Sequence, residues 1–152
     1  EYQCTAHAGM NGNIEIADLS ASGGGGGSSL QTRTTKTTTA TSLANNTTAN
    51  IAIDGFKAFG LMKIETSHAA WVRLYIDAAS RTADAGRAET SDPAPDAGVI
   101  AEVITTGAET VNLSPGVMGW LTSGTSISAA VTNKSGSTNN VVVTLTVLQL
   151  EA

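Results

Sequence analysis

Apolar and polar residues alternate at every second position along several short stretches of this chain. Residues 70–77 read AWVRLYID, so Val72, Leu74 and Ile76 share one side of an extended strand. The residues that project from the opposite side are Trp71, Arg73, Tyr75 and Asp77. This period predicts a β-strand with one face turned toward a core.

Two further stretches show a related pattern. Residues 58–66 read AFGLMKIET and predict a strand with two distinct sides. Strict alternation gives one side Phe59, Leu61, Lys63 and Glu65, and the other side Gly60, Met62 and Ile64. Residues 140–151 read NVVVTLTVLQLE and predict the most secure strand of the chain. Because apolar residues occupy both sides of that strand, we expect it in the centre of a sheet, covered on both faces.

Turn signals separate about eight or nine strands along the chain. The remaining strands are expected at residues 31–40, 50–54, 98–106, 109–114, 117–121 and 126–133, and a further short strand at residues 13–19 of the N-terminal segment. Pro115 and Gly116 predict a turn between two of them, and a helical turn is expected only near residues 80–88. This pattern predicts an all-β fold, an antiparallel β-sandwich that is either immunoglobulin-like or a jelly roll. We favour a jelly-roll-like sandwich, because the strand count suits two sheets of four strands each.

The inward faces of these strands define the expected core. Its members are Val72, Leu74, Ile76, Ile100, Val103, Val143, Leu145 and Val147. The threonine-rich residues 31–40 contain no large apolar side chain. We therefore expect that strand at an edge or on the outside of the sandwich.

A run of five glycines divides the chain. The glycine-rich residues 23–29 predict a flexible linker between an N-terminal arm, residues 1–22, and the sandwich domain, residues 30–152. The linker lacks the Gly-x4-Gly-Lys-Ser/Thr pattern of a phosphate-binding loop. The arm is expected to dock on a partner surface through the apolar side chains Tyr2, Ile14, Ile16 and Leu19. Two of these, Ile14 and Ile16, share one face of an extended strand, which suits strand addition to an exposed sheet edge.

The composition disfavours two classes of function. A net charge of −5 argues against nucleic-acid binding, which needs a clustered basic face. No Gly-x-Ser-x-Gly element is present, and hydroxyl residues are so abundant that none stands out as a nucleophile. His68 precedes a predicted strand, where a hydrogen-bonded or exposed histidine is commoner than a general base. We therefore expect a protein that is not an enzyme and has no cofactor.

Two sets of residues have the chemistry of metal ligands. Cys4 and His7 have a Cys-x2-His spacing, but a closed zinc site needs about four ligands, and His68 is the only further histidine. Carboxylates, the ligand type of calcium, recur in the loop after residue 77 as Asp84, Glu89, Asp92 and Asp96. The EF-hand spacing is missing, and Arg81 and Arg87 offer ion pairs to these acids instead. The sequence therefore predicts an internally paired loop without a metal.

Trp71, Arg73 and Tyr75 form the most distinctive set of side chains in the chain. They lie on the outward side of the strand at residues 70–77. Tryptophan, tyrosine and arginine are the residue types enriched at interface hot spots. We interpret the three side chains as a contact surface between subunits. Two alternatives stay open, which are packing at the edge of the core and a platform on which a sugar ring stacks.

Much of the chain resembles a known family. The strings GFKAFGLMKIETSHAAWVRLYIDAASRTADAGRAETSDPAPDAGVIAEVITTGAETVNLSPGVMGW and VTNKSGSTNNVVVTLTVLQLE are similar to a module that recurs in structural proteins of tailed bacteriophages, particularly those that infect cyanobacteria. The resemblance covers residues 30–151, and its most specific part is Ala70–Tyr75 together with SRTADA and GVIAEVITTGA. Residues 1–29 lie outside it.

The resemblance implies a virion component without known catalysis. The expected function is a capsid decoration or cement subunit, or a head-fibre-type subunit, held by the N-terminal arm. The alternative is a tail-fibre or tail-associated module that binds a host surface glycan. Expected partners are virion proteins such as the major capsid protein, and other copies of the chain in a homotrimer that protects sheet edges.

Two further expectations follow from the length of the apolar segments. None approaches the roughly 18 residues that a membrane span needs, so a membrane is not expected as a partner. No basic segment followed by an apolar run is present, so the sequence predicts no signal peptide.

Overall fold

The chain consists of two units, residues 1–30 and residues 31–152. The computed structural model describes residues 2–3, 11–12 and 31–152. In the first unit, β1 (Tyr2–Gln3) pairs antiparallel with β2 (Asn11–Gly12). The expectations that lie outside the described residues are the strand at 13–19, the linker at 23–29 and the arm side chains Ile14, Ile16 and Leu19.

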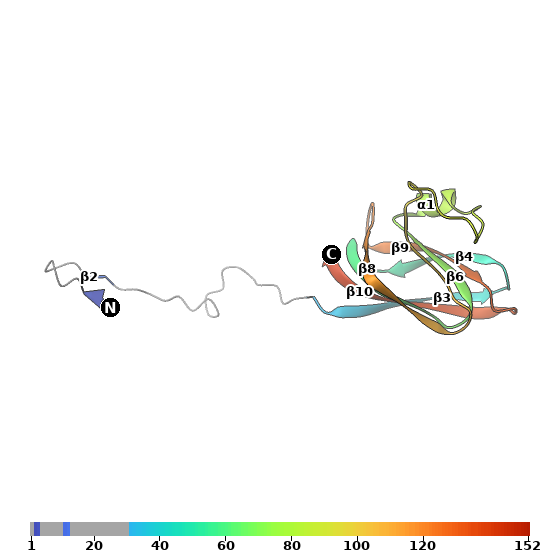
Figure 1. The fold of residues 1–152 in the computed structure, drawn as a ribbon, viewed down its shortest axis with the longest axis horizontal. Coiled ribbons are helices and arrows are strands. Elements are labelled where there is room, and N and C mark those ends of the chain that lie inside the picture. Colours follow the sequence, from blue (N-terminus) through green and yellow to red (C-terminus); the bar gives the residue numbers. More distant parts are fainter. Residues whose placement is uncertain (1, 4–10, 13–30) are drawn as a thin grey trace. The chain divides into compact units, whose positions relative to one another are not determined.

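The second unit contains eight strands and one short helix (Figure 1). In chain order they are β3 (Arg33–Leu43), β4 (Thr48–Asp54), β5 (Ala58–Thr66), β6 (Ala70–Tyr75), α1 (Ala78–Ala83), β7 (Val99–Ile104), β8 (Glu109–Trp120), β9 (Ser126–Asn133) and β10 (Asn139–Glu151). No helix within residues 31–152 is long and apolar enough to cross a membrane.

The eight strands form two antiparallel sheets that pack face to face (Figure 1). The strand orders are β3-β10-β5-β8 and β4-β9-β6-β7. Along the chain, β3 pairs with β10, β4 with β9, β5 with β8 and β6 with β7. A long antiparallel ribbon rolled into two sheets in this way is a jelly roll. The predicted all-β sandwich is confirmed.

The core lies between the two sheets. The predicted core residues that are buried are Val72, Leu74, Val103, Val143, Leu145 and Val147, and Ile100 packs against them. The prediction for Ile76 is wrong, because β6 ends at Tyr75 and the chain bends at residues 76–77. Ile76 is half-buried at the rim instead.

A bulge in β5 changes which side chains face the core. From Leu61 to Lys63 the chain advances two residues on β5 but only one on β10, so Met62 is an extra residue relative to β10. The pairing with β8 also shifts there, but the extra residues are on β8, between Asn112 and Val117. Phe59 and Leu61 are buried, but past the bulge the buried residues are Ile64 and Thr66. The expectation that Lys63 and Glu65 continue the face of Phe59 is therefore wrong.

The predicted turn at Pro115–Gly116 lies within one continuous strand. Both residues belong to β8, at the point where its pairing with β5 is irregular. Proline lacks a backbone N–H, and β8 is an edge strand with a free side, so the ladder tolerates it there. A side chain at residue 116 would also crowd β5, because a Cβ there would lie 3.1 Å from the Leu61 carbonyl oxygen.

Two predictions about strand positions are confirmed, one of them with a correction. The threonine-rich β3 is an edge strand, and β10 is central because it pairs with both β3 and β5. Residues Val141, Val143, Leu145 and Val147 of β10 are fully buried. On the opposite face of β10, the residues from Val142 to Leu148 are only half-buried, so the expected cover on both faces is wrong.

Candidate functional site

The chain between β6 and β7 folds over the second sheet. We call residues 76–98 the covering loop. It begins with α1, whose N-terminus is capped by Asp77 because that carboxylate accepts a 2.7 Å hydrogen bond from the Ser80 backbone N–H. Figure 1 shows α1 on the side of this sheet that faces away from the other sheet. Arg81 fastens the helix to β4 by donating a 3.1 Å hydrogen bond from Nη1 to the Ile51 carbonyl.

The covering loop buries the three side chains that we interpreted as an interface. Trp71, Arg73 and Tyr75 project away from the core, as the alternation predicts, but they are only 5%, 2% and 0% exposed. The expectation that they form an exposed contact surface is therefore wrong. The physical reason is that Asp84 and Arg87 of the covering loop lie against them and exclude solvent. The alternative of packing inside the domain agrees with this burial.

A charge cluster joins the covering loop to the sheet. It consists of Arg73, Asp84, Arg87 and Glu102. Arg87 donates from Nε to both carboxylate oxygens of Asp84, at 2.9 and 3.0 Å, and from Nη2 to Glu102. Its Nη1 donates to the Ser91 carbonyl at 2.7 Å. Hydrogen bonds that Arg87 donates to Glu102 and, to a lesser degree, to Asp84 raise its pKa against the opposing effect of burial. This cation therefore bridges two carboxylates and the backbone.

Tyr75 completes the link between β6 and the covering loop. Its hydroxyl donates a 2.7 Å hydrogen bond to Oδ2 of Asp84. Burial, helped by this hydrogen bond, raises the pKa of Tyr75 to about 12. Burial also acts to raise the pKa of Asp84, but hydrogen bonds from Arg87 and Tyr75 outweigh it and hold that pKa below its ordinary value. At neutral pH Tyr75 is therefore protonated and donates the hydrogen bond, and Asp84 is ionised and accepts it.

Arg73 has an unusual environment for a buried cation. Its guanidinium carbon lies 3.7 Å from the centre of the Trp71 ring, and that of Arg87 lies 5.4 Å from the same ring. Within the described part of the chain, Nε and Nη1 of Arg73 have no hydrogen-bond partner, and neither has Nε1 of Trp71. Contact with an aromatic face stabilises such a cation, more so when water is excluded. Arg73 of β6 and Arg87 of the covering loop therefore share the Trp71 ring.

The carboxylates of the covering loop do not converge on one point. Asp84 belongs to the charge cluster, whereas Glu89 pairs with Lys134 at 2.7 Å. Asp92 and Asp96 are exposed. Among residues 31–152, no group of three His, Cys, Asp or Glu side chains is arranged to hold a metal ion. The zinc candidates Cys4 and His7 lie outside the described residues.

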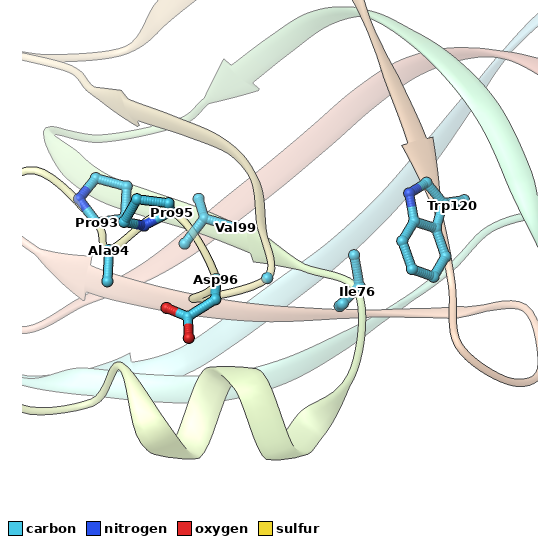
Figure 2. A pocket seen from close by; sticks show the side chains of 8 residues that line it. Ile76, Pro93, Ala94, Pro95, Asp96, Val99 and Trp120 are labelled. Atoms are coloured by element: carbon cyan, nitrogen blue, oxygen red, sulfur yellow. The ribbon is translucent and has the colours of Figure 1, made fainter.

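An open hollow of about 460 Å³ lies beside the covering loop (Figure 2). Its lining residues are Ile76, Pro93, Ala94, Pro95, Asp96, Gly98, Val99 and Trp120. Trp120, the last residue of β8, is 58% exposed. Sequence reasoning missed this site, because only the fold brings Trp120 next to residues 93–99. The one signal was that Trp120 is one of only two tryptophans in the chain.

Among the described residues, Ser67 and His68 form the pair that most resembles the serine and histidine of a catalytic site. Ser67 Oγ and His68 Nδ1 are 2.9 Å apart. The same Oγ accepts a 2.9 Å hydrogen bond from the Val142 N–H and donates to the Asn140 carbonyl at 3.4 Å. A serine used in this way fixes the turn before β6 to the start of β10.

Comparison with known proteins identifies no relative. No protein-family model matches the chain, and searches of curated proteins and of solved structures give no match. Its function is therefore inferred from its residues, fold and surface.

Proposed function

We propose that this chain is a non-enzymatic structural protein of a bacteriophage virion, a capsid decoration or cement subunit or a head-fibre-type subunit. The observation that carries the proposal is the jelly-roll topology of residues 31–152. The jelly roll is a recurrent fold of viral capsid domains. Since one fold serves many functions, the resemblance of residues 30–151 to phage structural proteins is the reason to choose this one.

The use of the ionisable side chains supports a role without catalysis. Arg87 of the covering loop binds both Asp84 and Glu102. The Tyr75 hydroxyl donates its hydrogen bond to Asp84. Ser67 is held by backbone groups of β10. These groups are engaged in holding segments of the domain together, which is what a structural subunit requires.

The separation of the chain into two units supports attachment through the arm. Within the described residues, all buried members of the sandwich core lie between Ala40 and Val147. Residues 31–152 form a compact unit of their own. The arm carries its own apolar residues Ile14, Ile16 and Leu19. A short apolar segment next to a glycine-rich stretch suits docking on the surface of a capsid protein.

Removal of the arm is expected to abolish attachment and leave the sandwich folded. The test compares the full chain with residues 31–152 in binding to phage particles that lack this protein. Far-UV circular dichroism and the thermal midpoint serve as the control for folding of the shorter chain. If residues 31–152 bind the particles as tightly as the full chain, attachment runs through the sandwich and the role of the arm is wrong.

Self-association as a homotrimer stays a prediction. Trp71 and Tyr75 do not provide its contact surface, because both are buried within one chain. Large apolar side chains that are exposed include Ile104 of β7 at 49% and Leu150 of β10 at 50%. The edge strands of the two sheets, which are β3, β8, β4 and β7, could also pair with another copy of the chain.

The alternative function is a tail-fibre or tail-associated module that binds a host glycan. The sequence suggested Trp71 and Tyr75 as the surface on which a sugar stacks, but both side chains are buried and cannot contact one. A sugar would need a different, exposed aromatic surface.

A further inference from the structure

We propose that the open hollow between residues 93–99 and Trp120 is a binding site for a neutral saccharide. In this site Trp120 provides the surface on which a sugar ring stacks, and the Asp96 carboxylate accepts hydrogen bonds from sugar hydroxyls. The inference does not depend on the architectural role, because a decoration subunit and a tail module can each carry such a site.

Trp120 is exposed to solvent, whereas the other tryptophan of the chain is buried. It is 58% exposed, whereas Trp71 is 5% exposed beneath the covering loop. Figure 2 shows Trp120 on one side of the hollow, with Asp96 and the two prolines on the other side and Ile76 between them. The indole ring therefore borders a space that is open to solvent and has a polar group on its far side. Aromatic rings that combine an apolar face with such polar neighbours are common in binding surfaces.

The wall opposite Trp120 is held in a fixed shape. Pro93 and Pro95 restrict the backbone, and the Ala97 N–H donates a 3.0 Å hydrogen bond to the Ala94 carbonyl, which closes a turn. Gly98 has a φ of +67°, and a Cβ at this position would lie 2.5 Å from Ser80 Oγ. Its carbonyl accepts a 3.0 Å hydrogen bond from the Ile76 N–H. A wall that is ordered before the ligand arrives reduces the entropic cost of binding.

The charge of the lining selects the class of ligand. Asp96 is the only ionisable residue among the eight that line the hollow, and no Lys, Arg or His is among them. A phosphate, a sulfate or a nucleic acid would meet a negative charge here without a compensating cation. Asp96 makes no ion pair with any residue of 31–152, so its oxygens are available to accept hydrogen bonds. The hollow thus favours a ligand that is uncharged and rich in hydroxyl donors.

The apolar part of the lining distinguishes a saccharide from an organic cation. Quaternary ammonium groups are recognised by cages of several aromatic rings, whereas Trp120 is the single aromatic residue of this lining. A pyranose ring has an apolar face of C–H groups that packs flat on one aromatic ring, while hydroxyls project from its edge. A single indole ring opposite an acceptor carboxylate matches that arrangement. The solvent-open side leaves room for the rest of a glycan chain.

The test uses the full chain on an array of immobilised glycans. The neutral probes are chains of hexose, deoxyhexose and N-acetylhexosamine units, and the charged probes are sialylated and phosphorylated glycans. We expect binding to a subset of the neutral probes, with affinities then measured by titration calorimetry. Trp120→Ala and Asp96→Asn are each expected to weaken binding about tenfold or more, as for central contact residues. Trp120→Phe is expected to retain part of the affinity, because it keeps an aromatic face.

Met118→Ala is the matched control, since Met118 is an exposed apolar residue of the same strand that does not line the hollow. It is expected to bind like the unaltered chain, and thermal midpoints show that each variant is folded. The proposal is overturned if no neutral glycan binds at millimolar concentration, if only charged probes bind, or if Trp120→Ala binds as well as Met118→Ala. None of these outcomes bears on the attachment of the chain to particles, which is a separate assay.

Discussion

Replacement of Arg87 by alanine is expected to lower the free energy of unfolding by about 3–5 kcal/mol, because it leaves buried charges without their partner. The Arg87 side chain is 8% exposed and binds Asp84 and Glu102, whose side chains are 6% and 22% exposed. It also donates to the Ser91 carbonyl of the covering loop. Its loss should therefore loosen residues 76–98 as well as destabilise the domain. Urea denaturation at pH 7 measures the first effect, and limited proteolysis of the covering loop measures the second.

The control for this variant is Lys57→Ala. Lys57 and Glu151 form an ion pair at 3.2 Å with side chains that are 46% and 58% exposed. Exposed ion pairs of this kind contribute about 0–1 kcal/mol, so the control should unfold almost like the unaltered protein. If Arg87→Ala lost no more stability than Lys57→Ala, the charge cluster would not be what holds the covering loop in place.

Replacement of Phe59 by alanine is expected to cost about 3–5 kcal/mol, the range for large aromatic residues in packed cores. Phe59 is fully buried on β5. It packs directly against the backbone of β8, because a Cβ on Gly119 would lie only 2.6 Å from its Cζ. Since both strands belong to one hydrogen-bonded ladder, the surroundings have little freedom to collapse into the space that the ring leaves. Thermal or urea unfolding measures the loss.

Phe56, the only other phenylalanine of the chain, gives a matched control. It is half-buried at the margin of the core, with Lys36 Nζ 4.7 Å from its ring centre. Phe56→Ala should cost less, about 1–2 kcal/mol, because less apolar surface is removed from the interior. Equal losses for the two variants would contradict the position assigned to Phe59 at the centre of the packing between the sheets.

The alternation of the sequence predicts the strands well where a single period governs them. The bounds expected for β5 and β9 agree with the structure, and Val72 and Leu74 of β6 are in the core as expected. The bulge at Met62 is different, because it is defined by the pairing of β5 with β10, which lies far away in the sequence. The same holds for Pro115, whose place inside a strand depends on that strand being at an edge.

The charge cluster over Trp71 and Tyr75 and the hollow beside Trp120 were harder to predict, because both are built from the polar covering loop. Residues 78–98 show no alternating pattern, so nothing in their order indicates that they cover β6. The pairing of loop acids with Arg87 was expected, and the contact of Asp84 with that residue confirms it. What the sequence did not reveal is that these paired charges would lie inward, over Trp71 and Tyr75. The neighbourhood of Trp120 and Asp96 depends on the topology alone.

The copy number of this chain in purified phage particles tests the proposed function most directly. The particles are those of the phage whose genome encodes the chain, and the chain is counted by quantitative mass spectrometry against the major capsid protein. A decoration or cement subunit follows the repeating symmetry of the shell, so we predict on the order of hundreds of copies per particle. Absence from the particle would contradict a virion role, and a few dozen copies or fewer would contradict decoration of the capsid and favour a fibre or tail component.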